Sequence, residues 1–482
     1  MFTDGKITQE EYINALNFTP EIITSNKNFN QYINACIEEA CTVLHMQNNQ
    51  IFNKSYTIFT YFDQNLQKIT EEILHNNTSN LENISTASLV TDNNGKVLTF
   101  AGNTPLNLYN TKRQPGSIIK PVLVYAPAIE YDIITPETII TDEPINIDGY
   151  SPENANKKYH GNVSVKESLS KSLNIPTVKI LNTTGIKRSK NIANKMGINF
   201  HEKDQNLSLA LGGFTTGCSM LELTESYLTL QNRGINIKPK FIKKIVDSNN
   251  TILYEDNSIG FRVIKETTAD SITEMLLNVA KNGTASRLSS LNIPIASKTG
   301  TVGLAGSNKN IDAWNASYTT KHVILTWLGT TDHSTSMDPN VNGSSYPTNI
   351  TKNICTYLYK SQKPNDFILL TTTNLKSNSL AESATTTSKI NTQENTSILH
   401  KPLLFINNFS NKKPELRFFT QFGLDYHILK NNEIIQTVSG TNNYYSYTDT
   451  SANKNEINTY SIIIKNENQT LESNKIKVLC LK

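Results

Sequence analysis

The sequence predicts an α+β fold, in which an antiparallel sheet is flanked by helices and followed by a C-terminal all-β sandwich domain. Three observations predict it. A hairpin signal lies close to residue 94, and an amphipathic helix at 270–282 precedes three strand-like runs. Residues 401–482 consist of short alternating runs with turns rich in Asn and Gly, a pattern typical of a small β-sandwich.

The hairpin signal is the tripeptide Asn93-Asn94-Gly95 between two strand-like runs, STASLVTD and KVLTFAG. Asn-Gly in such a place is the strongest short signal for a β-hairpin, because both turn residues must tolerate positive φ. The sequence therefore predicts two paired antiparallel strands here.

The helix at 270–282 has its apolar side chains in one stripe. Asp270 can cap its start, and Gly283 can adopt the left-handed conformation that stops it. The strand-like runs that follow are 293–301, 311–318 and 322–329.

The chain is too long for one ordinary domain. We expect a connector or pedestal region at 1–80 and the main catalytic domain at 81–360. A Ser/Thr/Asn-rich stretch cannot bury enough apolar area to order itself, which predicts a linker at 361–400. The small β-sandwich, of fibronectin III or immunoglobulin type, then occupies 401–482.

Charge and cysteine content narrow the classes of function. The formal charge is +3, from 45 basic and 42 acidic residues, so nothing favours nucleic-acid binding. The five cysteines are scattered, and the close pair Cys36 and Cys41 matches no zinc or redox spacing, so neither metal nor cofactor is expected. Residues 1–20 have no apolar segment of the kind that a signal peptide needs, and no run of about 18 apolar residues predicts a membrane span.

The segment RQPGSIIKP, residues 113–121, carries the first candidate for chemistry. Ser117 and Lys120 are three residues apart, so on a helix they share one face within hydrogen-bond reach. Pro115-Gly116 and Pro121 indicate that they form the opening turn of that helix. There the helix dipole and free N–H groups favour a developing oxyanion, and a lysine with a lowered pKa can act as base. Alone the pattern is weak, because it recurs at Ser168/Lys171, Ser410/Lys413 and Ser451/Lys454.

The second candidate pair is Ser172 and Asn174 in KSLNIP. Ser164 and Glu167 have the spacing of a capping box, so a helix begins there, and it ends before Pro176. A short loop at that end can direct Ser172 and Asn174 into a cleft. Helix capping is the alternative interpretation of this pair.

The third candidate is ASKTGT, in which Lys298-Thr299-Gly300-Thr301 lies on a strand-like run. Lys298 supplies positive charge and the two threonines supply hydroxyls, which suits a substrate carboxylate. Gly300 would let a ligand approach the backbone. Ser-x-x-Lys, Ser-x-Asn and Lys-Thr-Gly in this order are the set typical of penicillin-binding proteins and serine β-lactamases.

The surrounding residues resemble the transpeptidase part of class A penicillin-binding proteins over residues 1–360. The resemblance implies that family's fold and an acyl-serine mechanism without a cofactor. Class A members also carry an N-terminal glycosyltransferase and a membrane anchor, which we do not find in this sequence, so glycan polymerisation is not expected. The segments that carry the resemblance are RQPGSIIKP, YSPENANKKYHGNVSVKESLSKSLNIPTVKI, LSLALGGFTTGCSMLELTESYLTLQNRG, ASKTGT with DAWNASYT and VILTWLG, and YTIFTYFDQNLQKITEEIL.

By this resemblance, Ser117 is the acylated nucleophile and Lys120 its base, although the identity of the first proton acceptor is disputed in this superfamily. Ser172 would relay a proton to the leaving amine. Asn174 would bind the amide backbone of the substrate, and Lys298 would add positive potential.

The remaining roles concern the strand of the third motif. Thr299 and Thr301 would hold the terminal carboxylate of the substrate, next to Gly300. The backbone N–H groups of Ser117 and Thr301 would form the oxyanion hole, in which each donor is commonly worth about 3 kcal/mol.

The expected function is a D,D-transpeptidase that acts on peptidoglycan stem peptides on the outer side of the bacterial membrane and is inhibited by β-lactams. A D,D-carboxypeptidase uses the same site with water as acceptor. A serine β-lactamase needs a water-activating group, and no ExxLN-like segment follows Ser172. A non-catalytic β-lactam sensor or wall-binding protein is the third alternative, and the 401–482 sandwich is a candidate to bind wall polymer or a protein partner, or to act as a spacer.

Overall fold

The computed structural model describes residues 8–9, 30–52, 54–257, 259–332, 335–370, 404–410, 413–420, 424–439, 444–452, 456–465, 470–473 and 475–479. The chain forms two compact units, Met1–Ala384 and Thr385–Lys482, each described here by itself. Most of the predicted linker and the segment 10–29 lie outside the described residues. The finer division at residues 80, 360 and 400 stays a prediction.

The first unit is built on a five-stranded sheet in which every neighbouring pair of strands is antiparallel. Its central strands are buried at nearly every position, as expected of a sheet that is covered on both faces. The predicted α+β class is therefore confirmed. In spatial order the strands are β12 (Ala296–Gly303), β13 (Asn310–Tyr318), β14 (His322–Gly329), β2 (Ser85–Asp92) and β3 (Val97–Asn103).

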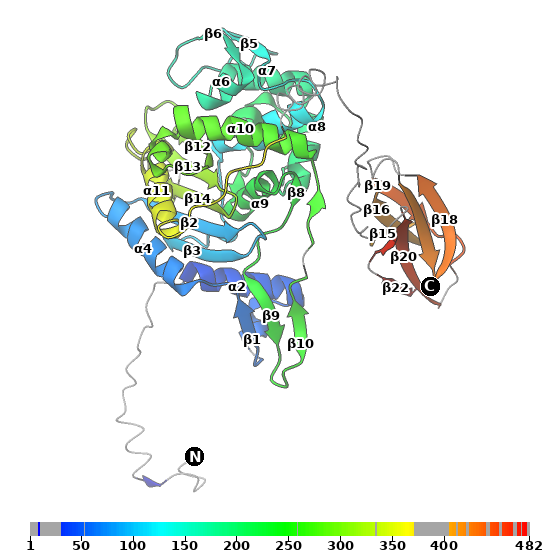
Figure 1. Cartoon of the computed structure of the whole chain (residues 1–482). Helices are drawn as coiled ribbons and strands as arrows, with labels where there is room; N and C mark the ends of the chain where they lie inside the picture. Colours follow the sequence, from blue (N-terminus) through cyan, green and yellow to red (C-terminus); the bar gives the residue numbers. More distant parts are fainter. Residues whose placement is uncertain are drawn as a thin grey trace, which may run out of the picture. The chain divides into compact units, whose positions relative to one another are not determined.

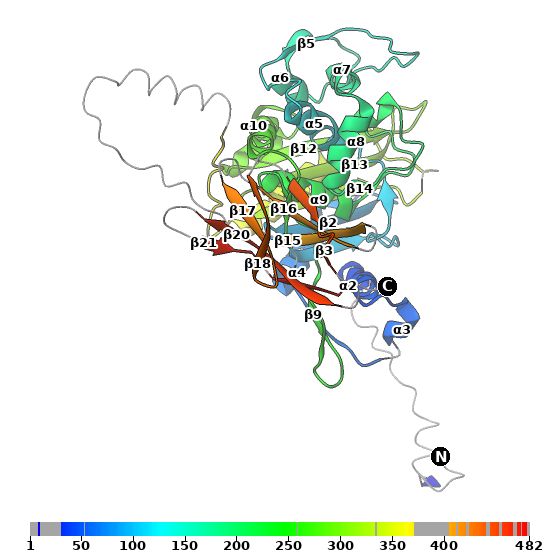
Figure 2. The same cartoon turned by 90° about the vertical axis from the view of Figure 1, so that its right-hand side faces the viewer.

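Two pairs of helices cover this sheet. Helices α9 (Met220–Gln231) and α10 (Glu266–Asn282) pack on each other and on the strands, and so do α4 (Gln64–Thr78) and α11 (Tyr346–Leu358). Figures 1 and 2 show α10 above the strands and α4 below them. The smaller elements of the unit are α3 (Asn48–Phe52), β4 (Lys112–Arg113), α5 (Ala126–Glu130), β5 (Ile139–Asp142), β6 (Gly161–Ser164), α6 (Val165–Ser170), α7 (Asn174–Thr184), α8 (Ile186–Lys195), β7 (Cys218–Ser219), β8 (Ile235–Asn236) and β11 (Phe261–Arg262).

The predicted hairpin is β2–β3, but its turn differs from the expected one. Of its residues only Gly95 has positive φ, at 79°. The Gly95 N–H donates to Asp92 O at 3.2 Å, and the Asp92 N–H donates to Lys96 O at 3.0 Å. This pattern fits a longer hairpin loop that ends in a left-handed glycine, so Asn94 is not required to adopt positive φ.

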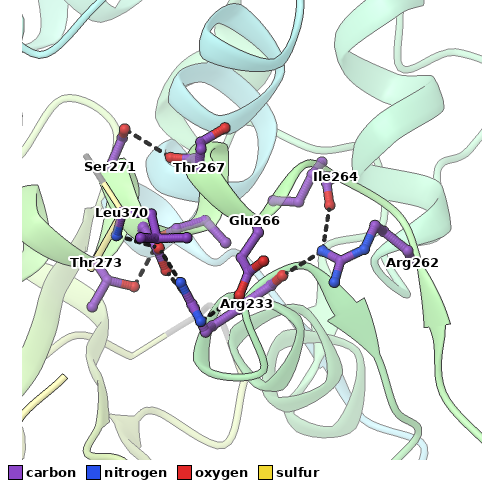
Figure 3. A network of polar contacts seen from close by, with 10 residues as sticks. Arg233, Arg262, Ile264, Glu266, Thr267, Ser271, Thr273 and Leu370 are labelled. Carbon is purple, nitrogen blue, oxygen red and sulfur yellow. Dashed lines mark hydrogen bonds and ion pairs between the residues drawn. The ribbon is translucent and has the colours of Figure 1, made fainter. Parts of the chain in front are cut away.

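Both predicted end signals of α10 are wrong. The helix begins at Glu266, four residues before Asp270, and Gly283 is extended (φ −106°) instead of left-handed. Asp270 lies inside the helix because its carboxylate has tertiary partners. It accepts two hydrogen bonds from the Arg233 guanidinium, at 3.0 and 2.6 Å, and one from the Leu370 N–H at 2.8 Å. Figure 3 shows both partners, Arg233 and Leu370.

A pedestal lies beneath the main sheet (Figure 1). It consists of helix α2 (Asn30–Leu44) and a small antiparallel sheet of β1 (Thr57–Thr60), β9 (Ile242–Val246) and β10 (Ile252–Glu255). Glu39 on α2 accepts the Phe241 N–H at 2.8 Å, which ties the helix to the start of β9.

The second unit consists of two antiparallel sheets that enclose an apolar core, which fits the predicted sandwich. The core includes Phe418, Tyr426 and Tyr460. One sheet contains β15 (Leu404–Ser410), β16 (Lys413–Phe419) and β19 (Tyr444–Thr448). The other contains β18 (Glu433–Ser439), β17 (Asp425–Lys430), β20 (Ile457–Lys465), β21 (Thr470–Glu472) and β22 (Ile476–Leu479).

Candidate active site

Ser117 lies in the first turn of a helical segment, as predicted, but this segment is irregular. Residues Gly116–Ile119 form a 3-10 turn, Pro121–Tyr125 form a π turn, and the α-helix α5 follows. Proline has no N–H to donate, so a regular α-helical ladder cannot run through Pro121. A side chain of helix α9 helps to hold this turn, because Tyr227 Oη donates to Ile118 O at 2.8 Å.

Strand β12 lies directly against this turn, and glycines permit the approach. A Cβ on Gly300 would come within 2.8 Å of Pro115 O and 3.0 Å of Ile118 Cγ2. A Cβ on Gly116, where φ is +52°, would meet Thr301 O at 3.0 Å. The sequence predicts that Gly300 lets a ligand approach, and this stays a prediction; in the structure the glycine is also required by the close approach of Pro115 and Ile118 in the Ser117 turn. The third motif is thereby held beside the first.

Lys120 is fully buried and bonds the second motif. Its Nζ donates to Ser172 O at 2.7 Å, to Asn174 Oδ1 at 2.8 Å and to Leu173 O at 3.1 Å. The expected hydrogen bond between Lys120 and Ser117 is not among those of the described residues. The physical reason is that the amine is surrounded by oxygens of the second motif, which also include Ser172 Oγ at 3.5 Å, so its N–H groups point to that motif. Burial lowers the pKa of Lys120 well below its ordinary value, and the positive charge of Lys298 lowers it further.

Ser172 joins the first and third motifs. Its backbone is left-handed (φ 57°), and its side chain lies between the two lysines. Lys298 Nζ donates to Ser172 Oγ at 2.8 Å, and Lys120 Nζ lies 3.5 Å from the same oxygen. Burial lowers the pKa of Lys298 to about 7. Both amines are therefore far easier to deprotonate than exposed lysines.

Asn174 is the first residue of α7, and both ends of its side-chain amide are bonded. Oδ1 accepts from Lys120, and Nδ2 donates to Glu153 O at 2.7 Å. The Asn174 N–H donates to the side chain of Asn154 at 2.8 Å. Glu153 and Asn154 belong to an exposed polar loop, and the sequence reasoning did not single them out.

The two threonines of β12 have different surroundings. Thr299 is buried, and its hydroxyl donates to Thr284 Oγ1 at 2.6 Å. Thr301 is exposed, and its hydroxyl accepts the Gly343 N–H at 3.0 Å, so its own hydrogen remains free to donate. Thr284, which follows α10, is a further residue at the site that no sequence pattern marked.

The structure thus brings the three predicted motifs together, from the Ser117 turn, the α6–α7 connection and the edge strand β12. Among the described residues, no three His, Cys, Asp or Glu side chains gather closely enough to hold a metal ion. No helix in the described part of the chain is long and apolar enough to cross a membrane.

Solved structures with similar folds come from the same class of protein. PonA1 of Mycobacterium tuberculosis in complex with penicillin V matches with a TM-score of 0.64 and 21% identity, over 71% of this chain and 96% of that one. Penicillin-binding protein 1A of Haemophilus influenzae matches with a TM-score of 0.60 and 18% identity, over 76% of each chain. At these identities the likeness shows the fold.

Sequence relatives extend the comparison. Penicillin-binding protein 1F of Bacillus subtilis is 31% identical over 344 residues, which are 68% of this chain and 47% of the relative. Penicillin-binding protein 1A of Streptococcus pneumoniae is 29% identical over 408 residues, which are 76% of this chain and 56% of the relative. The chain spans about half the length of these curated relatives.

The sequence model of the penicillin binding protein transpeptidase domain matches residues 85–356. This stretch is more than half of the chain, and it contains the Ser117 turn, the α6–α7 connection and strand β12, which lie together as described above. The chain therefore belongs to the family of penicillin-binding proteins with this transpeptidase domain.

Proposed function

We propose that the protein is a serine D,D-transpeptidase that joins peptidoglycan stem peptides through an acyl-enzyme on Ser117. The observation that carries the proposal is the pair of buried amines, Lys120 and Lys298, that meet at the hydroxyl of Ser172 beside the Ser117 turn. Two amines with lowered pKa around one hydroxyl form a route for protons between a nucleophile and a leaving group.

In the first half-reaction, Ser117 Oγ attacks the carbonyl between the two terminal D-alanines. Its proton passes to Lys120, for which the neutral form is favoured by burial and by Lys298. The C–O ester bond forms and the C–N bond breaks, while Ser172 Oγ gives a proton to the leaving amine and is reprotonated from Lys120. A hydrogen bond from Lys298 to Ser172 Oγ stabilises negative charge on that oxygen during the relay.

Negative charge on the carbonyl oxygen needs donors of its own. We assign this role to the backbone N–H groups of Ser117 and Thr301, which lie on the turn and on the strand that packs against it. Thr299 and Thr301 are proposed to hold the terminal carboxylate. An amine of a second stem peptide then attacks the ester, and the same groups return the protons.

We propose that the substrate lies in the cell wall, on the outer side of the bacterial membrane, and that β-lactams inhibit the protein. The solved PonA1 complex with penicillin V supports β-lactam binding in this fold. The role of the C-terminal sandwich as a binder of wall polymer or of a protein partner stays a prediction.

Incubation of the protein with a peptide that ends in D-Ala-D-Ala and an excess of a D-amino acid acceptor tests the proposal. Mass spectrometry should detect the transfer product, and Ser117→Ala should form none. Release of D-alanine without transfer would point to a carboxypeptidase. Turnover of nitrocefin beyond one equivalent would point to a β-lactamase, and no reaction with either substrate would contradict an enzymatic role.

A further inference from the structure

A polar loop, residues 143–160, connects β5 to β6, and two of its residues are buried among exposed ones. One of them is Asn154, which is only 3% exposed. Burying a polar side chain is costly unless all its groups are paired. A buried and fully hydrogen-bonded amide in an otherwise exposed loop therefore points to a specific role.

Every polar atom of the Asn154 side chain has a partner. Nδ2 donates to both carboxylate oxygens of Asp142, at 2.9 and 2.8 Å, and to Lys158 O at 2.9 Å. Oδ1 accepts the backbone N–H of Asn174 at 2.8 Å. Asp142 is 1% exposed and also accepts the His160 N–H at 2.9 Å, so it fixes which end of the Asn154 amide faces Asn174.

The neighbouring residue in the loop completes the arrangement. The carbonyl oxygen of Glu153 accepts from Asn174 Nδ2 at 2.7 Å, and this determines which end of the Asn174 amide faces Lys120. Only Oδ1 can accept from the Lys120 ammonium, and it does so at 2.8 Å. A reversed Asn174 amide would turn an N–H toward the ammonium, and a donor there cannot bond another donor.

We infer that Asn154, oriented by Asp142, is a positioning residue. By accepting the backbone N–H of Asn174 it keeps Glu153 O against Asn174 Nδ2, so that Asn174 Oδ1 stays on Lys120. It does not touch the substrate. It acts on acylation through Asn174, and the inference rests on the proposed function of Lys120 as the base.

The test is the second-order rate constant for acylation by a fluorescent penicillin, measured from about pH 6 to pH 9.5 with the full chain. Asn154→Ala should lower it by up to about 100-fold, the cost of a misplaced catalytic group. It should also move the acid limb of the rate profile to lower pH. The reason is that Lys120, having lost a bond that favours its charged form, loses its proton more easily. Lys298, the charged group that faces Lys120 from β12, is unchanged in this variant.

The matched control is Asn236→Ala. Asn236 is equally buried, at 1% exposure, and its Nδ2 donates to Glu225 Oε1 at 3.0 Å and Thr229 Oγ1 at 3.1 Å, away from the three motifs. Loss of this amide should lower the melting temperature but leave the acylation rate and its pH profile at the wild-type values. If the role of Asn154 were merely structural, Asn154→Ala and Asn236→Ala would have the same effects on the melting temperature, the acylation rate and its pH profile.

The exchange variant Asn154→Asp with Asp142→Asn provides a rescue. Asn154→Asp alone places two carboxylates opposite each other and should impair acylation. The exchange restores one hydrogen-bond donor and one acceptor between positions 142 and 154, and position 154 keeps an oxygen that accepts the Asn174 N–H. It should recover acylation to within about 10-fold of wild type, a difference of about 1.4 kcal/mol.

Three results would overturn the inference: a wild-type rate and profile in Asn154→Ala, an equal loss in Asn236→Ala, or an exchange that restores the melting temperature but not acylation. If Asn154→Ala does not fold, Asn154→Asp and the exchange decide alone. Failure of the wild type itself to react with penicillin would instead contradict the proposed function.

Discussion

Lys298 is a buried amine whose removal should change stability in a pH-dependent way. Its side chain is fully buried, and burial lowers its pKa from 10.5 to about 7. Between these two values the unfolded chain holds a proton on this amine that the folded protein has released. The stability of the wild type must therefore rise with pH across this window, and it must fall as pH decreases toward 7.

The size of the effect follows from the shift. One pKa unit corresponds to about 1.4 kcal/mol, so the full shift makes the charged amine cost about 5 kcal/mol in the folded state at pH 7 and below. Between about pH 7.5 and pH 9.5 the wild type should gain about 2 to 3 kcal/mol relative to Lys298→Met. The hydrogen bonds that Lys298→Met loses, to Ser172 and Thr299, add a cost that does not vary with pH.

Urea unfolding followed by tryptophan fluorescence measures this difference. Trp314 and Trp327 are the only tryptophans in the chain, and both lie in the central sheet of the first unit, so the signal is free of the sandwich. Lys203→Met, at an exposed lysine, serves as control and should differ from wild type by a constant amount. A free-energy difference between wild type and Lys298→Met that stays constant with pH would refute the reasoning.

Four further substitutions separate effects on packing from effects on acylation. Gly300→Ala places a methyl group 2.8 Å from Pro115 O in the Ser117 turn and should lower both the melting temperature and the acylation rate. Gly303→Ala, whose nearest contact is at 3.8 Å, should be tolerated. Melting curves and penicillin labelling check both variants. Asp270→Ala removes the bidentate partner of the partly exposed Arg233 guanidinium, which keeps Glu266, and should destabilise the first unit by about 1 to 3 kcal/mol. Urea unfolding measures this loss, and labelling at native conditions should be unchanged. Asp449→Ala removes a buried carboxylate from the core of the sandwich and should lower the melting temperature of the second unit alone, as seen by calorimetry, because no motif residue lies in that unit. A loss of labelling in Asp270→Ala or Asp449→Ala would contradict this separation.

Strands and helices with a clear period were predictable from local sequence. The runs 311–318 and 322–329 correspond to β13 and β14, and Ser164 caps α6 through the Glu167 N–H as its spacing predicts. Asp270 was misassigned because its partners, Arg233 and Leu370, are distant in sequence, and their tertiary bonds override the capping preference of an aspartate.

The site was predictable as a set of motifs but not as a network. The order of the three motifs identified Ser117, Ser172 and Lys298, yet spacing alone placed Lys120 against Ser117, and the structure bonds it to the second motif. Asn154 carried no signal, because an asparagine in a polar loop is ordinary until the fold brings it to Asn174. The contact between Asn154 and Asn174 forms only when the chain folds back on itself, so the local periodicity of the sequence does not predict it.

Acylation of Ser117 is tested most directly by peptide mass spectrometry after reaction with penicillin. We expect one penicilloyl group, on the peptide that contains Ser117, and none in Ser117→Ala. An adduct on any other residue, or undiminished labelling of Ser117→Ala, would contradict it.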